Sequence, residues 1–135
     1  MIHYTTIEQS KHLMELGLSA ETADMLWEQH NREEPYVTIK PWTTKGKSIG
    51  AHILPCWSLT ALLEAMPKAI TDEYDSKGWL GMSTLYNSTW GWIVYYSNAD
   101  ADCQALHEEQ GDTLLDAAYN MVCWLIEEGH IKKEV

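Results

Sequence analysis

The sequence predicts a single α+β domain over residues 1–135. Three observations favour this fold class: a β-prone hairpin over residues 79–96, a long apolar helix over 112–128 and a helical hairpin over 6–31. A chain of this length buries roughly two thirds of its unfolded surface, so one hydrophobic core is sufficient. We expect a small antiparallel sheet with the 112–128 helix on one face and the N-terminal helices on the other.

The first helix is predicted from its capping residues. Thr5 or Thr6 begins it, because Glu8 or Gln9 follows three residues later. Such pairs exchange hydrogen bonds with the free amides of the first helical turn. Gly17 then offers the left-handed conformation that ends many helices.

A second helix is predicted to begin at Ser19, which is a good cap, and to end near residue 31, before Pro35. Its apolar residues recur at helical spacing: Ala23, Leu26 and Trp27. The two helices together would form a tight helical hairpin over residues 6–31.

The middle of the chain predicts one short strand and one short helix. Residues 36–39 form a β-prone run that could join the sheet. Ser58 is a good cap for a third helix, which Pro67 limits because proline cannot continue a helix.

The hairpin over residues 79–96 is the strongest β signal in the sequence. Its two runs, 79–86 and 89–96, are rich in aromatic and β-branched residues. Asn87-Ser88 separates them and predicts a two-residue turn. Such a turn sets Ser83 opposite Trp92.

Both faces of this predicted hairpin are apolar. In the predicted register Trp79 shares one face with Val94 and Tyr96, and Leu80 shares the other face with Tyr95. A sheet with two apolar faces is normally buried on both. We therefore expect the hairpin to be covered on each side.

The C-terminal helix is expected to supply the centre of the core. Asp112 is its predicted cap, and Gly129 is its predicted stop. Apolar residues cover most of its circumference, and four of them are expected in the core: Leu115, Tyr119, Val122 and Ile126. Residues 97–111, between the hairpin and this helix, are expected to be an acidic connection.

The charge is strongly acidic and unevenly distributed. The net charge is −11, and there is no Lys or Arg between Gly78 and Ile131. Nucleic-acid affinity depends on basic residues that neutralise phosphates. We therefore expect no direct binding to DNA or RNA. An acidic protein can instead attract basic partners or imitate nucleic acid.

Cysteine usage and hydropathy predict a cytoplasmic protein. The three cysteines, Cys56, Cys103 and Cys123, cannot all pair with one another, and the sequence shows no secretion signal, so they are expected to be reduced. No apolar run approaches the roughly 20 residues that cross a bilayer, so no membrane partner is expected.

Four residues could in principle bind a metal ion. His52 and Cys56 are four residues apart, as are Cys103 and His107, and two sulfur and two nitrogen donors suit tetrahedral zinc. The segment between His52 and Cys56 is expected to be extended, however, and would hold those donors over roughly 10 Å apart. We therefore expect no metal and no cofactor. A small metal-dependent enzyme that uses these four donors remains the alternative.

Four aromatic residues form the candidate set for ligand or partner binding: Trp42, Trp90, Trp92 and Tyr95. They could form a stacking platform, although aromatic residues that alternate along a strand are more often part of a core. Gly81 is expected to make room for a neighbouring indole. No catalytic residue is predicted, because the sequence contains no recognisable nucleophile motif.

Three stretches carry a resemblance to a known group of proteins. They are residues 5–25, residues 56–63, which begin Cys56-Trp57-Ser58, and residues 111–129, which begin Gly111-Asp112-Thr113. In combination they resemble small uncharacterised proteins encoded by phages and prophages of anaerobic gut bacteria, and the resemblance extends over most of the chain. The resemblance implies a mobile-element origin, and it assigns no catalytic residues to this chain because none are established for the group. The last stretch also resembles the closing helix of phage α–β–α sandwich domains.

These observations favour a non-enzymatic phage or prophage accessory module that binds a protein partner. A homodimer is one form of this interaction, since fourteen Trp and Tyr residues are many for one small core and an exposed apolar patch usually marks a partner site. Such an interface should avoid the acidic residues 98–112 and strengthen with added salt. A further alternative is an acidic nucleic-acid mimic that inhibits a host DNA-binding protein.

Overall fold

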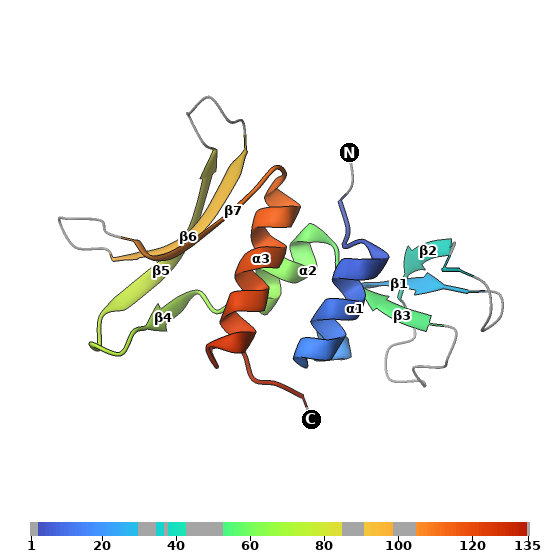
Figure 1. The fold of residues 1–135 in the computed structure, drawn as a ribbon, viewed down its shortest axis with the longest axis horizontal. Helices are drawn as coiled ribbons and strands as arrows, with labels where there is room; N and C mark the ends of the chain where they lie inside the picture. The colour runs from blue at the N-terminus through green and yellow to red at the C-terminus, as the bar shows by residue number, and fades with distance from the viewer. Residues whose placement is uncertain are drawn as a thin grey trace.

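The structure is a computed structural model that describes residues 3–29, 35–36, 38–42, 53–84, 91–98 and 105–134. Over these residues the fold is α+β, as the sequence predicts. Two antiparallel sheets lie at opposite ends of the molecule, with the α-helices between them (Figure 1).

The first predicted helix is confirmed as α1 (Ile7–Leu16). The Thr6 hydroxyl accepts a hydrogen bond from the Gln9 amide at 3.1 Å, and the Gln9 side chain accepts one from the Thr6 amide at 3.0 Å. Gly17 follows with a φ of 97°, a left-handed conformation that costs glycine little.

The second predicted helix is wrong. Ser19 caps only a single 3-10 turn, η1 (Ala20–Thr22), and the chain then enters strand β1 (Met25–Glu28). The residues that suggest a helix are also compatible with a strand, in which Leu26 is buried. Pairing with strands on both sides satisfies the β1 backbone, so tertiary context overrides the local helical pattern.

The first sheet has the strand order β2-β1-β3, with β2 (Thr38–Pro41) and β3 (Ile53–Cys56) both antiparallel to β1. The predicted strand over 36–39 therefore exists, shifted by two residues. The sequence allows this strand to join the sheet of the 79–96 hairpin, but the structure places it in the other sheet.

The third predicted helix is confirmed as α2 (Leu59–Ala65), with Ser58 as its cap. The carboxylate of Asp24, just before β1, accepts hydrogen bonds from the Ser58 amide at 2.9 Å and from the Ser58 hydroxyl. Asp24 thereby fixes the start of α2 against the first sheet.

The second sheet is a meander in the order β4-β5-β6-β7. Its strands are β4 (Ala69–Thr71), β5 (Lys77–Thr84), β6 (Trp92–Asn98) and β7 (Ala105–Gly111). The sequence predicts the two central strands but neither edge strand. The expectation that residues 97–111 form only a connection is wrong from Ala105 onward.

The predicted register of the hairpin is also wrong, by one residue. Thr84 lies opposite Trp92, where Ser83 was expected. Along the chain, the number of residues between the two members of each β5–β6 pair is odd. A two-residue turn would require an even number. The predicted turn, Asn87-Ser88, lies outside the described residues.

The one-residue shift exchanges the partners on the two faces of the sheet. Leu80 lies opposite Tyr96, and Gly81 lies opposite Tyr95. Trp79 therefore shares a face with Tyr95 and not, as expected, with the buried Tyr96.

The C-terminal helix is confirmed as α3 (Leu114–Glu127), although Thr113, not Asp112, caps it. Its buried residues lie at the centre of the core: Leu115, Ala117, Ala118, Met121, Val122, Leu125 and Ile126. Tyr119 is half-buried and packs against this core. Gly129 ends the helix with a φ of 80°, and the His130 amide donates to the Leu125 carbonyl.

The helices all lie on one side of the second sheet. In Figure 1 α3 packs against one face of the second sheet, where it contacts β6 and β7, and α1 lies beyond α3, next to the first sheet. The expectation that the N-terminal helices cover the other face is therefore wrong, and no helix of the described residues covers that face. None of the helices in the described ranges is long and apolar enough to span a bilayer.

Candidate functional site

The structure separates the aromatic residues that the sequence singles out. Trp42 follows β2 beside the first sheet and is only 8% exposed. Trp92 is half-buried against the core, and Tyr95 lies on the uncovered face of the second sheet. Trp90 lies outside the described residues. Trp42 and Tyr95 belong to different sheets, so they form no common platform.

The predicted metal donors are separated as well. Cys56 lies on β3 and is fully buried, and its sulfur lies 3.4 Å from the carbonyl oxygen of Thr5. His107 lies on β7, on the far side of both α1 and α3 (Figure 1). His52 and Cys103 lie outside the described residues. Within the residues that the structure describes, no group of three metal-binding side chains comes together.

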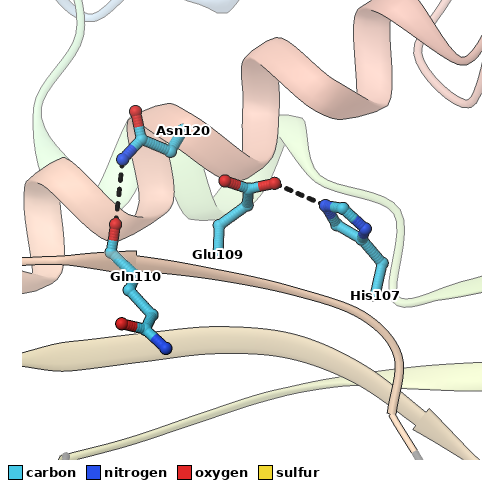
Figure 2. A network of polar contacts seen from close by, with 4 residues as sticks. All are labelled: His107, Glu109, Gln110 and Asn120. Carbon is cyan, nitrogen blue, oxygen red and sulfur yellow. Dashed lines mark hydrogen bonds and ion pairs between the residues drawn. The ribbon is translucent and has the colours of Figure 1, made fainter.

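A polar cluster lies where β7 meets α3 (Figure 2). The His107 ring stacks on the Trp124 indole, with 3.7 Å between the ring centroids and an angle of 6° between the planes. Its Nε2 atom contacts the Glu109 carboxylate. The two side chains point to the same side of β7, since they are two residues apart on a strand.

The same cluster ties β7 to α3 through its backbone. The Asn120 amide group of α3 donates a hydrogen bond to the Gln110 carbonyl at 2.9 Å. The His107 and Asn120 interactions both join one strand to the helix that follows it. We therefore interpret this cluster as structural, because its contacts hold β7 against α3.

Neither described cysteine is chemically activated. Burial, together with the nearby carboxylates of Glu127 and Glu109, raises the pKa of the Cys123 thiol to about 11. Burial also raises the pKa of the Cys56 thiol. Because the thiolate is the reactive form, these positions do not favour nucleophilic catalysis at neutral pH.

A shallow hollow of about 220 Å³ lies between η1 and α2. Its lining consists of Glu21, Thr22, Ala61, Glu64 and Ala65. The lining contains no thiol or imidazole. Its ionisable groups are the carboxylates of Glu21 and Glu64, and the lining does not indicate a catalytic site.

The uncovered side of the second sheet is the most distinctive surface in the described part of the chain. We call it the open face and define it by six residues that strand alternation places together: Lys77, Trp79, Gly81, Ile93, Tyr95 and Glu108. The Trp79 side chain is 45% exposed, a large fraction for an indole within a strand.

Gly81 gives the open face its local shape. A Cβ atom at this position would lie only 2.6 to 2.8 Å from the ring atoms of Tyr95. The phenol ring of Tyr95, and not the indole expected from the sequence, therefore occupies the space above Gly81. Gly81 is two residues from Trp79 along β5, so both positions lie on the same face of the sheet.

The open face also carries two charges of opposite sign. The Lys77 ammonium lies 4.5 Å from the centroid of the Trp79 ring. Glu108 lies opposite Tyr95 on the neighbouring strand, and its residue is exposed. The sequence does not single out Trp79, because the predicted hairpin register differs by one residue from the structure. It does not single out Glu108, because β7 is not predicted.

The chain is thus an α+β protein with one open, aromatic sheet face and no assembled catalytic group among its described residues. Comparisons with family models, with curated proteins and with solved structures find no match to it.

Proposed function

We propose that the protein is a non-enzymatic interaction module that binds a protein partner through the open face. This role is compatible with the mobile-element origin that the resemblance to phage and prophage proteins implies. The observation that carries the proposal is the exposure of Trp79 on a sheet face that no described helix covers. Two half-buried apolar residues, Ile93 and Tyr95, share this face, and exposed apolar patches commonly mark partner sites.

The packing of the rest of the molecule supports the same interpretation. On the helix-facing side of the sheet, Val94 and Tyr96 are fully buried. Trp79 and Tyr95 contribute little to that core, so folding alone does not account for two aromatic residues on the opposite side. Aromatic residues are enriched at the centres of protein interfaces.

Position-specific photo-crosslinking in the cells that naturally contain the protein tests this proposal. A benzoylphenylalanine at position 83, on the open-face side of β5, should give one defined adduct and leaves Trp79 in place. The same group at Lys11 or Glu64, which are exposed on α1 and α2, serves as the matched control. The proposal fails if position 83 gives no adduct, or if all three positions give the same adducts.

A second measurement separates binding from folding. Trp79→Ser should remove the adduct formed through position 83 and leave the urea midpoint almost unchanged, because the indole lies outside the core. Loss of both the adduct and the folded state would instead assign Trp79 a structural role.

A further inference from the structure

The open face already holds a cation against its exposed indole. The Lys77 ammonium lies 4.5 Å from the centroid of the Trp79 ring. The face of an indole is electron-rich and attracts ammonium and guanidinium groups, more often guanidinium. The ring of Trp79 is therefore a surface that accepts a positive charge, which here comes from the chain itself.

The charges around this indole favour a cation from outside as well. The four strands of the second sheet contain one Lys or Arg, Lys77, and two glutamates, Glu108 and Glu109. Glu108 is exposed on the open face, whereas Glu109 contacts His107 on the opposite side. The whole chain carries a net charge of −11. Such a field attracts basic segments and repels acidic ones.

The spacing of the open face matches an extended peptide. Trp79 and Gly81 are two residues apart on β5, and the Tyr95 ring lies over Gly81 with Glu108 beyond it on β7. Side chains on one side of an extended peptide repeat at about 6.6 Å, the same repeat as along β5. Alternate side chains of a peptide lying along β5 would therefore reach first Trp79 and then the Tyr95–Glu108 pair.

Building on the proposed function, we propose that the partner presents a basic extended segment to the open face. One arginine or lysine of this segment stacks on Trp79 and displaces Lys77. The next basic side chain on the same side lies over Tyr95 and pairs with Glu108. Lys77 is then an internal competitor that occupies the site in the free protein.

A second copy of the chain is the competing occupant. Lys77 of one copy could pair with Glu108 of the other across a two-fold axis. Two chains of charge −11 repel each other, however, and the repulsion is largest at low salt. The two occupants predict opposite effects of removing Lys77, which makes them separable.

The test measures fluorescence anisotropy with a labelled, end-blocked peptide of alternating arginine and threonine, at about 0.15 M salt. A peptide with glutamate in place of arginine is the reference. The proteins are the wild type, Trp79→Ala, Trp79→Tyr, Glu108→Gln and Lys77→Gln. Lys11→Gln and Glu64→Gln are matched controls, because they change the net charge equally at exposed sites on α1 and α2.

The proposal expects the arginine peptide to bind and the glutamate peptide not to bind. Trp79→Ala should weaken binding about fivefold or more, and Trp79→Tyr should retain most of it, because both aromatic rings attract a guanidinium group. Glu108→Gln should weaken binding about threefold. Lys77→Gln should tighten binding about twofold or more, because it removes the competing cation. The two controls should match the wild type.

Three outcomes would overturn the proposal. Equal affinity of the peptide for the wild type and Trp79→Ala would show only a general attraction between opposite charges. Weaker binding to Lys77→Gln would show that Lys77 helps the ligand. Absence of peptide binding, together with a mass that doubles in light scattering for the wild type but not for Trp79→Ala, would assign the open face to a second copy. That last result would leave the proposed function intact, whereas absence of peptide binding, self-association and cross-linking would remove both proposals.

Discussion

Thr5 is fully buried and connects the N-terminus to the first sheet through a small polar network. Its hydroxyl oxygen accepts a hydrogen bond from the Trp57 amide at 3.0 Å and lies 2.8 Å from the Ser10 hydroxyl. Its carbonyl accepts a hydrogen bond from the Trp27 indole at 3.1 Å. A side chain this small thus satisfies polar groups from two other segments.

The polar network makes Thr5→Val a sensitive test of the fold. Valine has the same shape but no oxygen, so the buried Trp57 amide would lose its partner. Leaving such a group unsatisfied should lower the free energy of unfolding by about 1–3 kcal/mol. Urea titration measures the change. Thr5→Ser keeps the oxygen and should cost less, and equal stability of Thr5→Val and the wild type would contradict the role assigned to the hydroxyl.

The environment of Cys123 predicts a pH dependence of stability. Burial, with Glu127 and Glu109 nearby, raises the pKa of this thiol to about 11 in the folded protein, whereas the unfolded value lies near 9.0. Above pH 9 the unfolded state therefore releases its proton first, and the free energy of unfolding falls as the pH rises towards 11. Cys123→Ala should make that fall smaller.

Urea titrations at several pH values between 8 and 11 measure this effect. A Cys103→Ser background removes the cysteine that lies outside the described residues. An identical slope with and without Cys123 would contradict the assignment of the titration to this thiol.

Helix α3 joins the second sheet to the other two α-helices. Leu115 is 4% exposed and Ile126 is fully buried, and these residues lie near its two ends. Leu115→Ala and Ile126→Ala should each lower the free energy of unfolding by about 2–5 kcal/mol, because each leaves a cavity. Denaturant titration measures both, with the exposed Glu127→Ala as a control on the same helix. A cost below about half a kcal/mol at both sites would contradict the central position of α3.

The elements that the sequence predicts correctly are those with their signals close together in the chain. The cap at Thr6, the stop at Gly17 and the cap at Ser58 act within one helical turn, and the structure confirms α1 and α2. The apolar circumference of α3 is similarly local. Such features can be recognised without knowledge of the rest of the fold.

The elements that the sequence does not predict depend on contacts distant in the chain. Strand β1 forms because β2 and β3 flank it, although its residues also fit a helix. Strand β7 is acidic and only half-buried, so its own composition gives no β signal. The order of the strands could not be predicted from local patterns.

The candidate site depends on these same distant contacts. The register between β5 and β6 decides which aromatic residues share a face, and one residue of shift moved Trp79 to the wrong side. Glu108 joins the open face only because β7 pairs with β6. Sequence reasoning identified Tyr95 as a candidate, but it could not place Tyr95 with its actual neighbours.

At the scale of the whole molecule, the net charge of −11 opposes the compact state through self-repulsion. Residues 68–135 contain 12 acidic and 4 basic side chains, so the half of the chain that includes the second sheet repels itself. Raising the salt concentration from about 0.05 to about 0.5 M should increase the free energy of unfolding, because it screens that repulsion.

Urea titration across this salt series measures the effect. A double variant with Glu73→Lys and Glu128→Lys, both at exposed positions, would reduce the net charge from −11 to −7, since each change adds two positive charges. It should show a smaller increase with salt. An equal increase in both proteins would indicate a general salt effect in place of charge screening.

The edges of the second sheet limit how chains can assemble. Strand β4 has three residues, and β7 carries two adjacent glutamates and has its Gln110 carbonyl occupied by Asn120 of α3. Short or charged edges that already have hydrogen-bond partners resist extension by another strand. The sheet is therefore protected against fibril-like growth, and it can display an aromatic surface to a partner without becoming a template for polymerisation.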